Sequence, residues 1–218
     1  MFKVLVADPP WSFDTWSEKG KDRSPEQHYQ CMTKEDIYNL EVASICDKDC
    51  VLFLWVTPPT LEQGLETMRR WGFTYKTKGF NWVKRNQKAL SYDQIIEELS
   101  SEDFNKEKLL KKLTGRRQWF MANGYYSRSN SEDCLIGVRG KPPKILDRGV
   151  LQVVDSPVTK HSQKPEEIQN RIERLVGKDL PKCELFARRK REGWTCLGNE
   201  IDGLDIREAM KGLKNLKA

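Results

Sequence analysis

The residues best suited to chemistry are Asp8-Pro9-Pro10-Trp11, which directly follow an apolar run. Val4 to Ala7 are predicted to form a buried strand, because a short continuous apolar run fits a parallel sheet covered on both faces. The strand must end at Asp8, since the two prolines cannot continue a hydrogen-bonded ladder. An acid at this position stands where open α/β sheets bind ligands, and the prolines hold Trp11 and the backbone carbonyls in a fixed direction. The tetrad therefore predicts a site; the alternative is a stiff loop with a surface acid and a packing tryptophan.

Segments that alternate between strand and helix patterns must position this tetrad. Apolar runs bounded by turn residues predict further strands at residues 51–56, 73–83, 134–138, 150–154, 182–187 and 194–197. Apolar residues at helical spacing predict helices at 34–40, 61–71 and 164–176, with Thr33 and Thr60 as caps. This alternation is typical of an α/β fold with a mostly parallel sheet and helices on both faces. No Gly-x-Gly-x-x-Gly or Walker loop is present, which argues against a dinucleotide enzyme or an NTPase.

Three segments fall outside the regular pattern. Ser12 to Gln30 is polar and lacks apolar periodicity, which predicts a long loop of the kind that often covers a site. Residues from about 89 to 113 have amphipathic spacing and predict a helical hairpin insertion, with Ser101 capping its second helix. A polar tail is expected after Leu197. For 218 residues we expect one domain, residues 1–218, that carries the 89–113 insertion.

Composition narrows the classes of function without choosing one. Thirty-eight Lys and Arg residues against 32 Asp and Glu residues give a formal net charge of +6, which permits a polyanionic partner but does not demand one. Six cysteines without a Cys-x-x-Cys pair, together with two histidines, argue against a metal site and indicate reduced thiols in a cytoplasmic protein. The apolar run Val51 to Val56 is far shorter than the roughly 20 residues that span a bilayer, so no membrane is expected.

Further motifs accompany the tetrad in order along most of the chain. They are Tyr29–Thr33, Leu52–Thr57, Asn81–Asn86, Cys134–Gly140, His161–Pro165, Glu184–Arg188 and Trp194–Glu200. With these motifs and the tetrad, the chain resembles the MT-A70 family, the adenine-N6 methyltransferases related to the catalytic subunit of the eukaryotic messenger-RNA adenine methyltransferase. The resemblance implies a Rossmann-like, S-adenosylmethionine-dependent methyltransferase fold in a permuted order. The catalytic strand would come first and the cofactor strand near the carboxyl end.

The resemblance also implies methyl transfer to the exocyclic N6 amine of adenine. The lone pair of this amine is delocalised into the ring, so an enzyme must draw both amino hydrogens towards acceptors. Asp8 and the backbone carbonyl of Pro9 supply two acceptors, and the carboxylate stabilises the positive charge that grows on the nitrogen. Trp11 and Phe13 would stack on the flipped base.

The same resemblance assigns residues to the cofactor, and charge assigns residues to the substrate. The implied contacts of S-adenosylmethionine are Asp8, Lys164, Phe186, Arg188, Asn199 and Glu200. In this assignment Lys164 pairs with the methionine carboxylate, while Asn199 and Glu200 hold the nucleoside end. A cluster of cations and amides suits a phosphate backbone. The substrate contacts expected from it are the loop Ser12–Gln30 and Lys84, Arg85, Asn86, Lys141, Lys144 and Arg148.

Several alternatives stay open on the sequence alone. DNA is favoured over RNA as the substrate because the chain resembles the compact bacterial and phage members of the family. The chain could instead be a non-catalytic nucleic-acid-binding subunit, or could methylate a protein amide or a small molecule, although related amide enzymes usually carry Asn in place of Asp8. The apolar residues of the insertion, among them Ile95, Ile96 and Leu99, could join two copies, join a paralogous partner, or cover the domain's own sheet.

Overall fold

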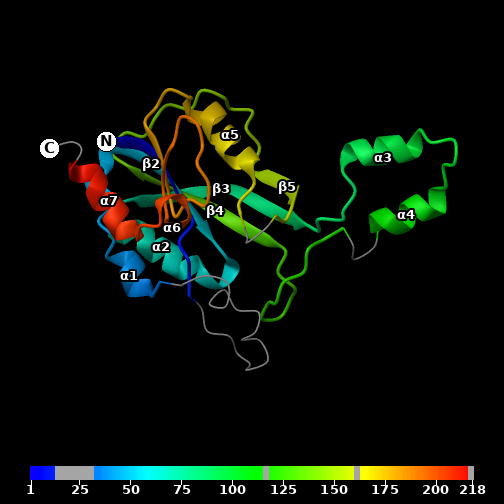
Figure 1. The fold of residues 1–218 in the computed structure, drawn as a ribbon, viewed down its shortest axis with the longest axis horizontal. Coiled ribbons are helices and arrows are strands. Elements are labelled where there is room, and N and C mark those ends of the chain that lie inside the picture. Colours follow the sequence, from blue (N-terminus) through cyan, green and yellow to red (C-terminus); the bar gives the residue numbers. More distant parts are fainter. Residues whose placement is uncertain (13–31, 115–117, 160–162, 216–218) are drawn as a thin grey trace.

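The computed structural model describes residues 1–12, 32–114, 118–159 and 163–215. The strands in these ranges are β1 (Phe2–Ala7), β2 (Cys46–Val56), β3 (Thr74–Arg85), β4 (Ser131–Arg139), β5 (Val153–Pro157), β6 (Lys182–Leu185) and β7 (Thr195–Leu197). The helices are α1 (Lys34–Tyr38), α2 (Leu61–Arg70), α3 (Tyr92–Leu99), α4 (Lys106–Thr114), α5 (Glu166–Val176), α6 (Asn199–Asp202) and α7 (Ile206–Asn215), with 3₁₀ turns at Val42–Ser44 and Pro58–Thr60. The strands form one sheet in the order β5-β3-β4-β2-β1-β6-β7 (Figure 1).

The directions of the strands gather one edge of the sheet into a candidate binding edge. β1 is parallel to β2 and to β6, β6 is parallel to β7, and β3 is parallel to β5. β4 is antiparallel to both of its neighbours, β2 and β3. The carboxyl ends of the parallel strands therefore meet the amino end of β4 at one edge. Ala7 pairs with Leu54 and Leu185, so this edge begins at Asp8. The mostly parallel sheet predicted from the sequence is confirmed.

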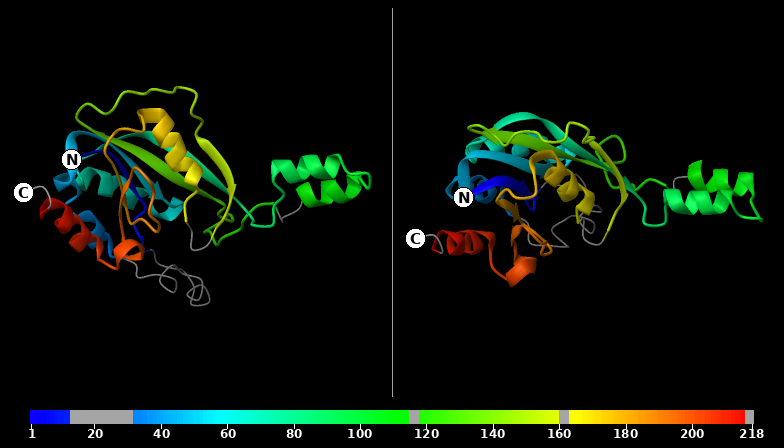
Figure 2. Two further views of the ribbon diagram at one scale, coloured as in Figure 1. Left: turned by 45° about the horizontal axis from the view of Figure 1, so that its top comes forward. Right: turned by 90° about the horizontal axis from the view of Figure 1, so that it is seen from above.

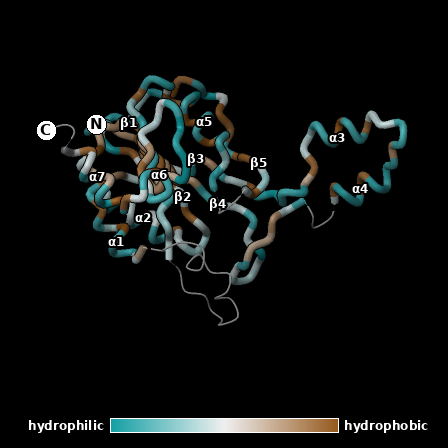
Figure 3. The backbone as a smooth tube through the Cα atoms, viewed as in Figure 1, coloured by the Kyte–Doolittle hydropathy of each residue, from teal (hydrophilic) through white to brown (hydrophobic). Residues whose placement is uncertain are grey.

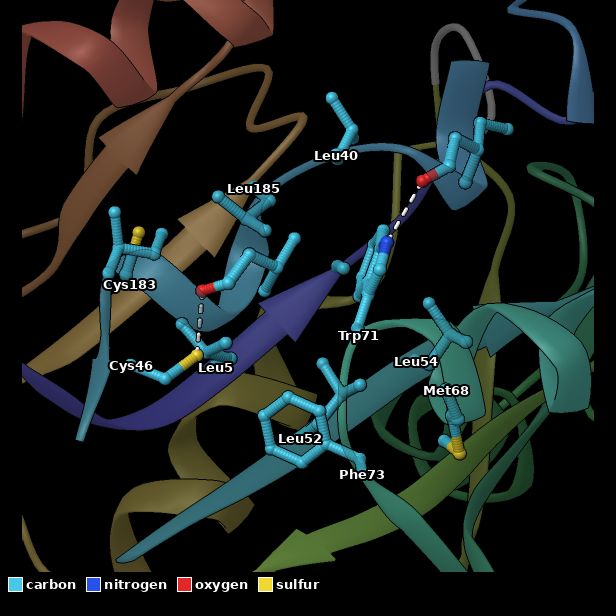
Figure 4. Packing of buried hydrophobic residues seen from close by; sticks show 14 of the residues in the cluster. Leu5, Leu40, Cys46, Leu52, Leu54, Met68, Trp71, Phe73, Cys183 and Leu185 are labelled. Atoms are coloured by element: carbon cyan, nitrogen blue, oxygen red, sulfur yellow. Dashed lines mark hydrogen bonds between the residues drawn. The ribbon is translucent and has the colours of Figure 1, made fainter. Parts of the chain in front are cut away.

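One face of the sheet is covered by α1, α2 and α7 (Figures 1 and 2). Leu5 of β1 belongs to a core that includes Ile37 of α1, Met68 of α2 and Met210 of α7. Trp71 follows α2, and its indole Nε1 donates a hydrogen bond of 2.9 Å to the backbone carbonyl of Ile37 (Figure 4). This bond joins α1 to the end of α2 while both helices bury apolar side chains against the strands.

The opposite face of the sheet is covered by α5. Val4 and Val6 alternate with the residues of the first core and pack in a second core with Ile168 and Ile172 of α5. α5 ends at Gly177, whose φ of 103° lies in the region that favours glycine. Helices on both faces, as predicted, therefore hold β1 between two apolar layers.

The boundaries of several strands differ from those predicted, and β2 and β5 show why. β2 begins at Cys46 rather than at residue 51, and Cys46 pairs with Phe2 at the start of β1. β5 lies at Val153–Pro157 rather than at 150–154, because its pairing with β3 starts at Val153. Hydrophobicity could not reveal this shift, since Leu151 and Val153 remain 73% and 54% exposed. Strand pairing sets these boundaries.

Helices α6 and α7 follow β7 within the described residues, so the prediction of a polar tail is wrong. On α7 the apolar residues Ile206, Ala209 and Met210 recur at helical spacing and are buried in the first core. The charged residues between them conceal this pattern in the sequence. None of the described helices combines the length and the apolar character needed to cross a membrane.

The caps of the helices were predicted with mixed success. Thr33 caps α1, and its Oγ1 accepts a backbone N–H of the first turn at 3.1 Å. Thr60 precedes α2 without capping it, because its hydroxyl faces Thr57 at 3.0 Å. Ser101 does not cap α4, because its hydroxyl accepts the N–H of Asp103 in the preceding turn. The cap of α4 is Asn105, whose side-chain oxygen accepts the N–H of Lys108 at 2.9 Å.

α3 and α4 occupy the predicted insertion and extend away from the sheet (Figure 2).

Candidate active site

Asp8 stands at the end of β1, on the edge where the parallel strands end. Its backbone N–H still reaches a carbonyl oxygen of β6, at 3.5 Å. The next residues form a tight turn, because the N–H of Trp11 donates to the carbonyl of Pro9 at 2.8 Å. The carbonyl of Pro10 accepts the N–H of Met32 at 3.1 Å. A fixed φ at both prolines and these two bonds hold the carboxylate and the carbonyls in one orientation.

Trp11 anchors this turn to the neighbouring strand. Its side chain is only 5% exposed, and its indole Nε1 donates to the backbone carbonyl of Trp55 in β2 at 3.0 Å. The ring therefore belongs to the core of the described structure. Stacking of Trp11 on a base stays a prediction, and it would require the ring to be uncovered. Phe13, the other predicted stacking residue, lies outside the described residues, as does nearly all of the loop Ser12–Gln30.

The carboxylate of Asp8 is the outer member of a row of four charged side chains that alternate in sign. Lys164 Nζ, just before α5, lies 2.6 Å from Asp8 Oδ2 and 3.1 Å from Glu132 Oε2 at the amino end of β4. The other oxygen of Glu132 pairs with Lys84 at the end of β3. The side chains of Lys164, Glu132 and Lys84 are 9%, 7% and 10% exposed, whereas that of Asp8 is 22% exposed. The row thus runs from the interior to a carboxylate that faces outwards.

Aromatic rings surround the two ammonium groups of this row. Lys164 Nζ lies 5.4 Å from the ring centre of Trp55. Lys84 Nζ lies 4.9 Å from the ring of Trp82 and 5.7 Å from that of Phe120. A cation over an aromatic face is attracted to the electrons of the ring, and more strongly where water is excluded. These rings therefore stabilise the ammonium groups of Lys84 and Lys164 and shield them from water.

The charges of the row fix the protonation of its buried members. Burial acts to lower the pKa of Lys164, but the carboxylates of Asp8 and Glu132 outweigh it and raise this pKa above its usual value. Burial acts to raise the pKa of Glu132, but Lys164 and Lys84 outweigh it and lower this pKa. Both side chains therefore stay charged near neutral pH. Among the described residues, no cluster of His, Cys, Asp and Glu is arranged to hold a metal ion.

Glu132 is the member of the row that sequence reasoning missed. The sequence places the strand at 134–138, which leaves Glu132 outside it, whereas β4 begins at Ser131. Side chains alternate along a strand, so Glu132 shares a face with Cys134, which is fully buried. Burial raises the pKa of the Cys134 thiol, and the nearby charge of Asp8 adds to that effect. An acid two residues before a buried cysteine was the available signal.

Four of the six residues predicted to bind the cofactor lie just after β6 and β7, on the side of the sheet next to β1. Phe186 follows β6 with a φ of 61°, a left-handed conformation that is uncommon for any residue but glycine. Arg188 Nη1 lies 3.4 Å from Glu200 Oε1, and Asn199 begins α6 next to it. Gly198 permits this close approach, since a Cβ there would lie 2.3 Å from the carbonyl oxygen of Ala187. The structure brings these predicted residues together; their cofactor contacts stay predictions.

Three of the residues predicted to contact substrate have partners inside the chain. Lys84 belongs to the buried row. Arg85 Nη2 donates to the carbonyl of Leu90 at 2.9 Å and to Oε1 of Gln118 at 2.6 Å. Asn86 Nδ2 donates to the carbonyl of Trp119 at 2.9 Å. Arg85 and Asn86 hold together the two segments that flank α3 and α4, and contact of these three residues with substrate stays a prediction.

Lys141 and Lys144 do not lie beside Asp8. They follow β4, whose carboxyl end lies at the opposite edge of the sheet from Asp8 because β4 is antiparallel. There they line a cavity of about 390 Å³ together with Lys3, Asp49 and Asp179. The sequence could not show this separation, because it depends on the direction of β4. Any contact of these lysines with a nucleic acid would be remote from the row of charges.

Exposed aromatic residues on the edge of Asp8 were not selected from the sequence. They lie in the segment between α4 and β4, which pairs with β3 through the bridge of Arg85 and Trp119. Trp119, Tyr125 and Tyr126 are 44%, 75% and 95% exposed. The two tyrosine rings contact each other edge to face, with centroids 4.9 Å apart. Their concentration within a few residues of sequence was the available signal.

Comparisons with known proteins give the site a context. The MT-A70 family model matches residues 2–200. The catalytic subunit METTL3 of the human N(6)-adenosine-methyltransferase is 31% identical over 207 residues, which cover 94% of this chain and 29% of METTL3. The MT-A70-like N(6)-adenosine-methyltransferase of Arabidopsis thaliana is 30% identical over 94% of this chain and 24% of its own length. The type II methyltransferase M.MunI of a Mycoplasma species is 26% identical over 92% of this chain and 78% of its own length. The chain thus spans about a quarter of the two eukaryotic relatives.

The first prediction concerns the stability that Glu132 contributes. Glu132→Gln leaves Lys84 and Lys164 buried with one carboxylate fewer between them. We expect the free energy of unfolding to fall by about 3 kcal/mol or more, because a buried charge that loses its partner is strongly destabilising. Urea unfolding followed by circular dichroism measures this change.

The matched control is Asp133→Asn, because Asp133 and its partner Lys78 have side chains that are 32% and 43% exposed. This control should cost less than about 1 kcal/mol. The difference between Glu132→Gln and the wild type should also shrink in acid, since a carboxyl group with a lowered pKa loses its contribution as the pH falls through that pKa. Equal stabilities for the two variants would contradict the importance of the buried row.

Proposed function

The chain belongs to the MT-A70 family, and on that premise we propose that it transfers a methyl group from S-adenosylmethionine to the N6 amine of adenine in DNA. The observation that carries the proposal is the carboxylate of Asp8, fixed 2.6 Å from Lys164 at the end of β1 and next to the carbonyl of Pro9. Two acceptors at such an edge suit the two hydrogens of an amino group. Their orientation is fixed before any substrate binds.

The side chains near β6 and β7 fit the cofactor chemically. Asn199 and Glu200 offer amide and carboxylate oxygens, which accept hydrogen bonds from ribose hydroxyls. Phe186 offers an apolar ring beside them, and Asp8 offers a negative charge for the methionine amine. When bound, S-adenosylmethionine supplies a methyl group on a positively charged sulfur. Lys164, which belongs to the row of charges, would form an ion pair with the methionine carboxylate of the bound cofactor.

Asp8 supports the reaction through its charge and its fixed position. Its carboxylate and the carbonyl of Pro9 would accept hydrogen bonds from the two amino hydrogens of adenine, which orients the lone pair of the nitrogen towards the methyl donor; the nitrogen loses one of these hydrogens as a proton after the new bond to carbon has formed. Positive charge grows on this nitrogen as it reacts, and an anion already in place stabilises that charge without reorganisation. Lys164 orients the carboxylate, and the aromatic rings around the row exclude water from its inner side.

The exposed aromatic segment supports a nucleic acid as the substrate. Trp119, Tyr125 and Tyr126 present rings to solvent on the same edge as Asp8. Bases stack on such rings with little regard to sequence, and each stacked base contributes about 1–3 kcal/mol. A base that leaves its helix to reach Asp8 would expose neighbouring bases that these rings could hold.

The choice of DNA over RNA rests on the size of the relatives. The chain covers 78% of the compact bacterial relative, a type II methyltransferase, but only 29% of human METTL3. RNA is the alternative substrate. A non-catalytic nucleic-acid-binding subunit is the alternative function, but such a subunit would have no need of Asp8 or of the buried cation that orients it.

The direct test is mass spectrometry of nucleosides after incubation with cofactor labelled in its methyl group. Single-stranded and double-stranded DNA and RNA of equal sequence are the substrates. We expect labelled N6-methyladenine in DNA. Label in RNA alone would overturn the choice of DNA, and no label in any nucleic acid would favour the non-catalytic subunit. Label in protein would favour an amide or other side-chain substrate.

Asp8→Asn should reduce the rate of methyl transfer by about 100-fold or more. Asn keeps an acceptor oxygen for Lys164 but lacks the charge that opposes the positive charge on the nitrogen, so the rate should fall more than nucleic-acid affinity. Initial rates at saturating substrate measure the change. Asp133→Asn, which removes a carboxylate on the same edge, serves as the control and should retain activity. A rate for Asp8→Asn within tenfold of the wild type would exclude the proposed role.

The aromatic segment yields a separate prediction. Replacing Tyr125 and Tyr126 by Ala should weaken binding of single-stranded oligonucleotides by about 10-fold or more, the loss expected for at least one stacked base. Fluorescence anisotropy measures the binding, and calorimetry should show unchanged cofactor affinity. Tyr75→Ala is the control, because Tyr75 is 44% exposed at the start of β3, on the opposite edge. Equal binding by both variants would remove this segment from the substrate surface.

A further inference from the structure

The helical hairpin formed by α3, α4 and the turn between them, called the arm below, lies away from the body of the protein. It is inserted between β3 and β4 and projects beyond the sheet (Figures 1 and 2). Its base is firmly held, because Arg85 donates to the carbonyl of Leu90 at 2.9 Å and to the side chain of Gln118 at 2.6 Å. Beyond this base, the arm needs another source of stability.

The inner face of the arm is small. Leu109 is the buried residue of α4, and α3 contains none. Ile95 and Leu113 are partly buried, and Lys112 of α4 pairs with Glu98 of α3. Helices this short are marginal in water unless an apolar face is packed. One small inner face therefore leaves the arm short of packing partners.

A second apolar face of the arm is open to solvent. Tyr92, Ile96 and Leu99 recur at helical spacing on α3 and are 73%, 59% and 52% exposed. Leu110 of α4 and Phe104 of the turn add 47% and 44% exposed side chains. Figure 3 shows the hydrophobic stretches that interrupt the mainly hydrophilic course of both helices. Several large apolar residues exposed on one small hairpin favour an interaction site.

The charges of the arm are divided between its two helices. The acidic side chains lie on α3 and the turn after it, a stretch without Lys or Arg: Asp93, Glu97, Glu98, Glu102 and Asp103. The lysines lie on α4, where Glu107 is the one acid: Lys106, Lys108, Lys111 and Lys112. A polyanion would meet repulsion from α3, and a cationic surface would meet repulsion from α4. A second arm in antiparallel orientation would place acids opposite lysines at both helices.

We infer that two copies of this chain associate through their arms. A twofold axis puts α3 of each copy against α4 of the other, which covers the exposed apolar side chains and pairs the opposite charges. The four short helices then share one packed interior, which supplies the stability that a single arm lacks. This association needs neither cofactor nor substrate, so it stands or falls separately from the proposed function.

A charge-swap experiment tests the interface. The first variant, Asp93→Lys with Glu97→Lys, has two basic helices in its arm. The second variant, Lys108→Glu with Lys111→Glu, has two acidic helices. All four positions are exposed. We expect a dimer for the wild type, measured by light scattering over a dilution series, and dissociation constants raised by about 100-fold or more for each variant alone. An equimolar mixture of the two variants should form a dimer again.

Two controls separate the arm from general effects. Glu35→Lys with Glu62→Lys changes the net charge as the first variant does, but at exposed positions of α1 and α2, and should leave the dimer intact. Ile96→Ser with Leu99→Ser should abolish the dimer, and mixing should not restore it. Circular dichroism checks that each variant is folded. A monomeric wild type at every concentration, variants that dimerise like the wild type, or a mixture that stays monomeric would each overturn the inference.

Discussion

The ion pair between Asp8 and Lys164 is the interaction on which the rest of the site depends. Lys164 is nearly buried, and an unpaired ammonium in such a place would lose its proton or unfold its surroundings. Glu132 and Lys84 extend the pairing inwards, so that the row carries two charges of each sign. Because the inner members are paired and fixed, the carboxylate of Asp8 keeps its direction at the end of β1.

The sequence was sufficient for the sheet, most helices and the position of the tetrad, because apolar periodicity and proline reveal these features locally. The sequence was insufficient where contacts with distant segments set the boundaries of a strand or the burial of a helix. The boundaries of β5 follow the register with β3, and α7 hides three buried residues among charges. The residues around Asn199 that the motif resemblance selects lie together at one edge of the sheet, and the turn that gathers them depends on Gly198 and on the unusual backbone of Phe186.

The site itself was only partly predictable, because the residues that lie near Asp8 depend on the direction of β4 in the sheet. Asp8 and Lys164 could be selected from motifs, but their direct contact could not, since 156 positions separate them along the chain. Glu132 and the misplaced pair Lys141 and Lys144 lie at opposite ends of β4. Because β4 is antiparallel to its neighbours, its amino end lies beside Asp8 and its carboxyl end lies at the opposite edge. The direction of a strand cannot be predicted from its local sequence pattern.

The reversal of β4 also explains why the chain tolerates an insertion at this point. Val83 near the end of β3 pairs with Ser131 at the start of β4, so the two ends of the intervening segment are neighbours in the ladder. Closing a longer loop between adjacent ends costs only slowly increasing entropy, about 0.6 kcal/mol for each doubling of length. The junction between β3 and β4 is therefore a permissive insertion site: segments of very different length can connect these strands while the edge that begins at Asp8 keeps its geometry.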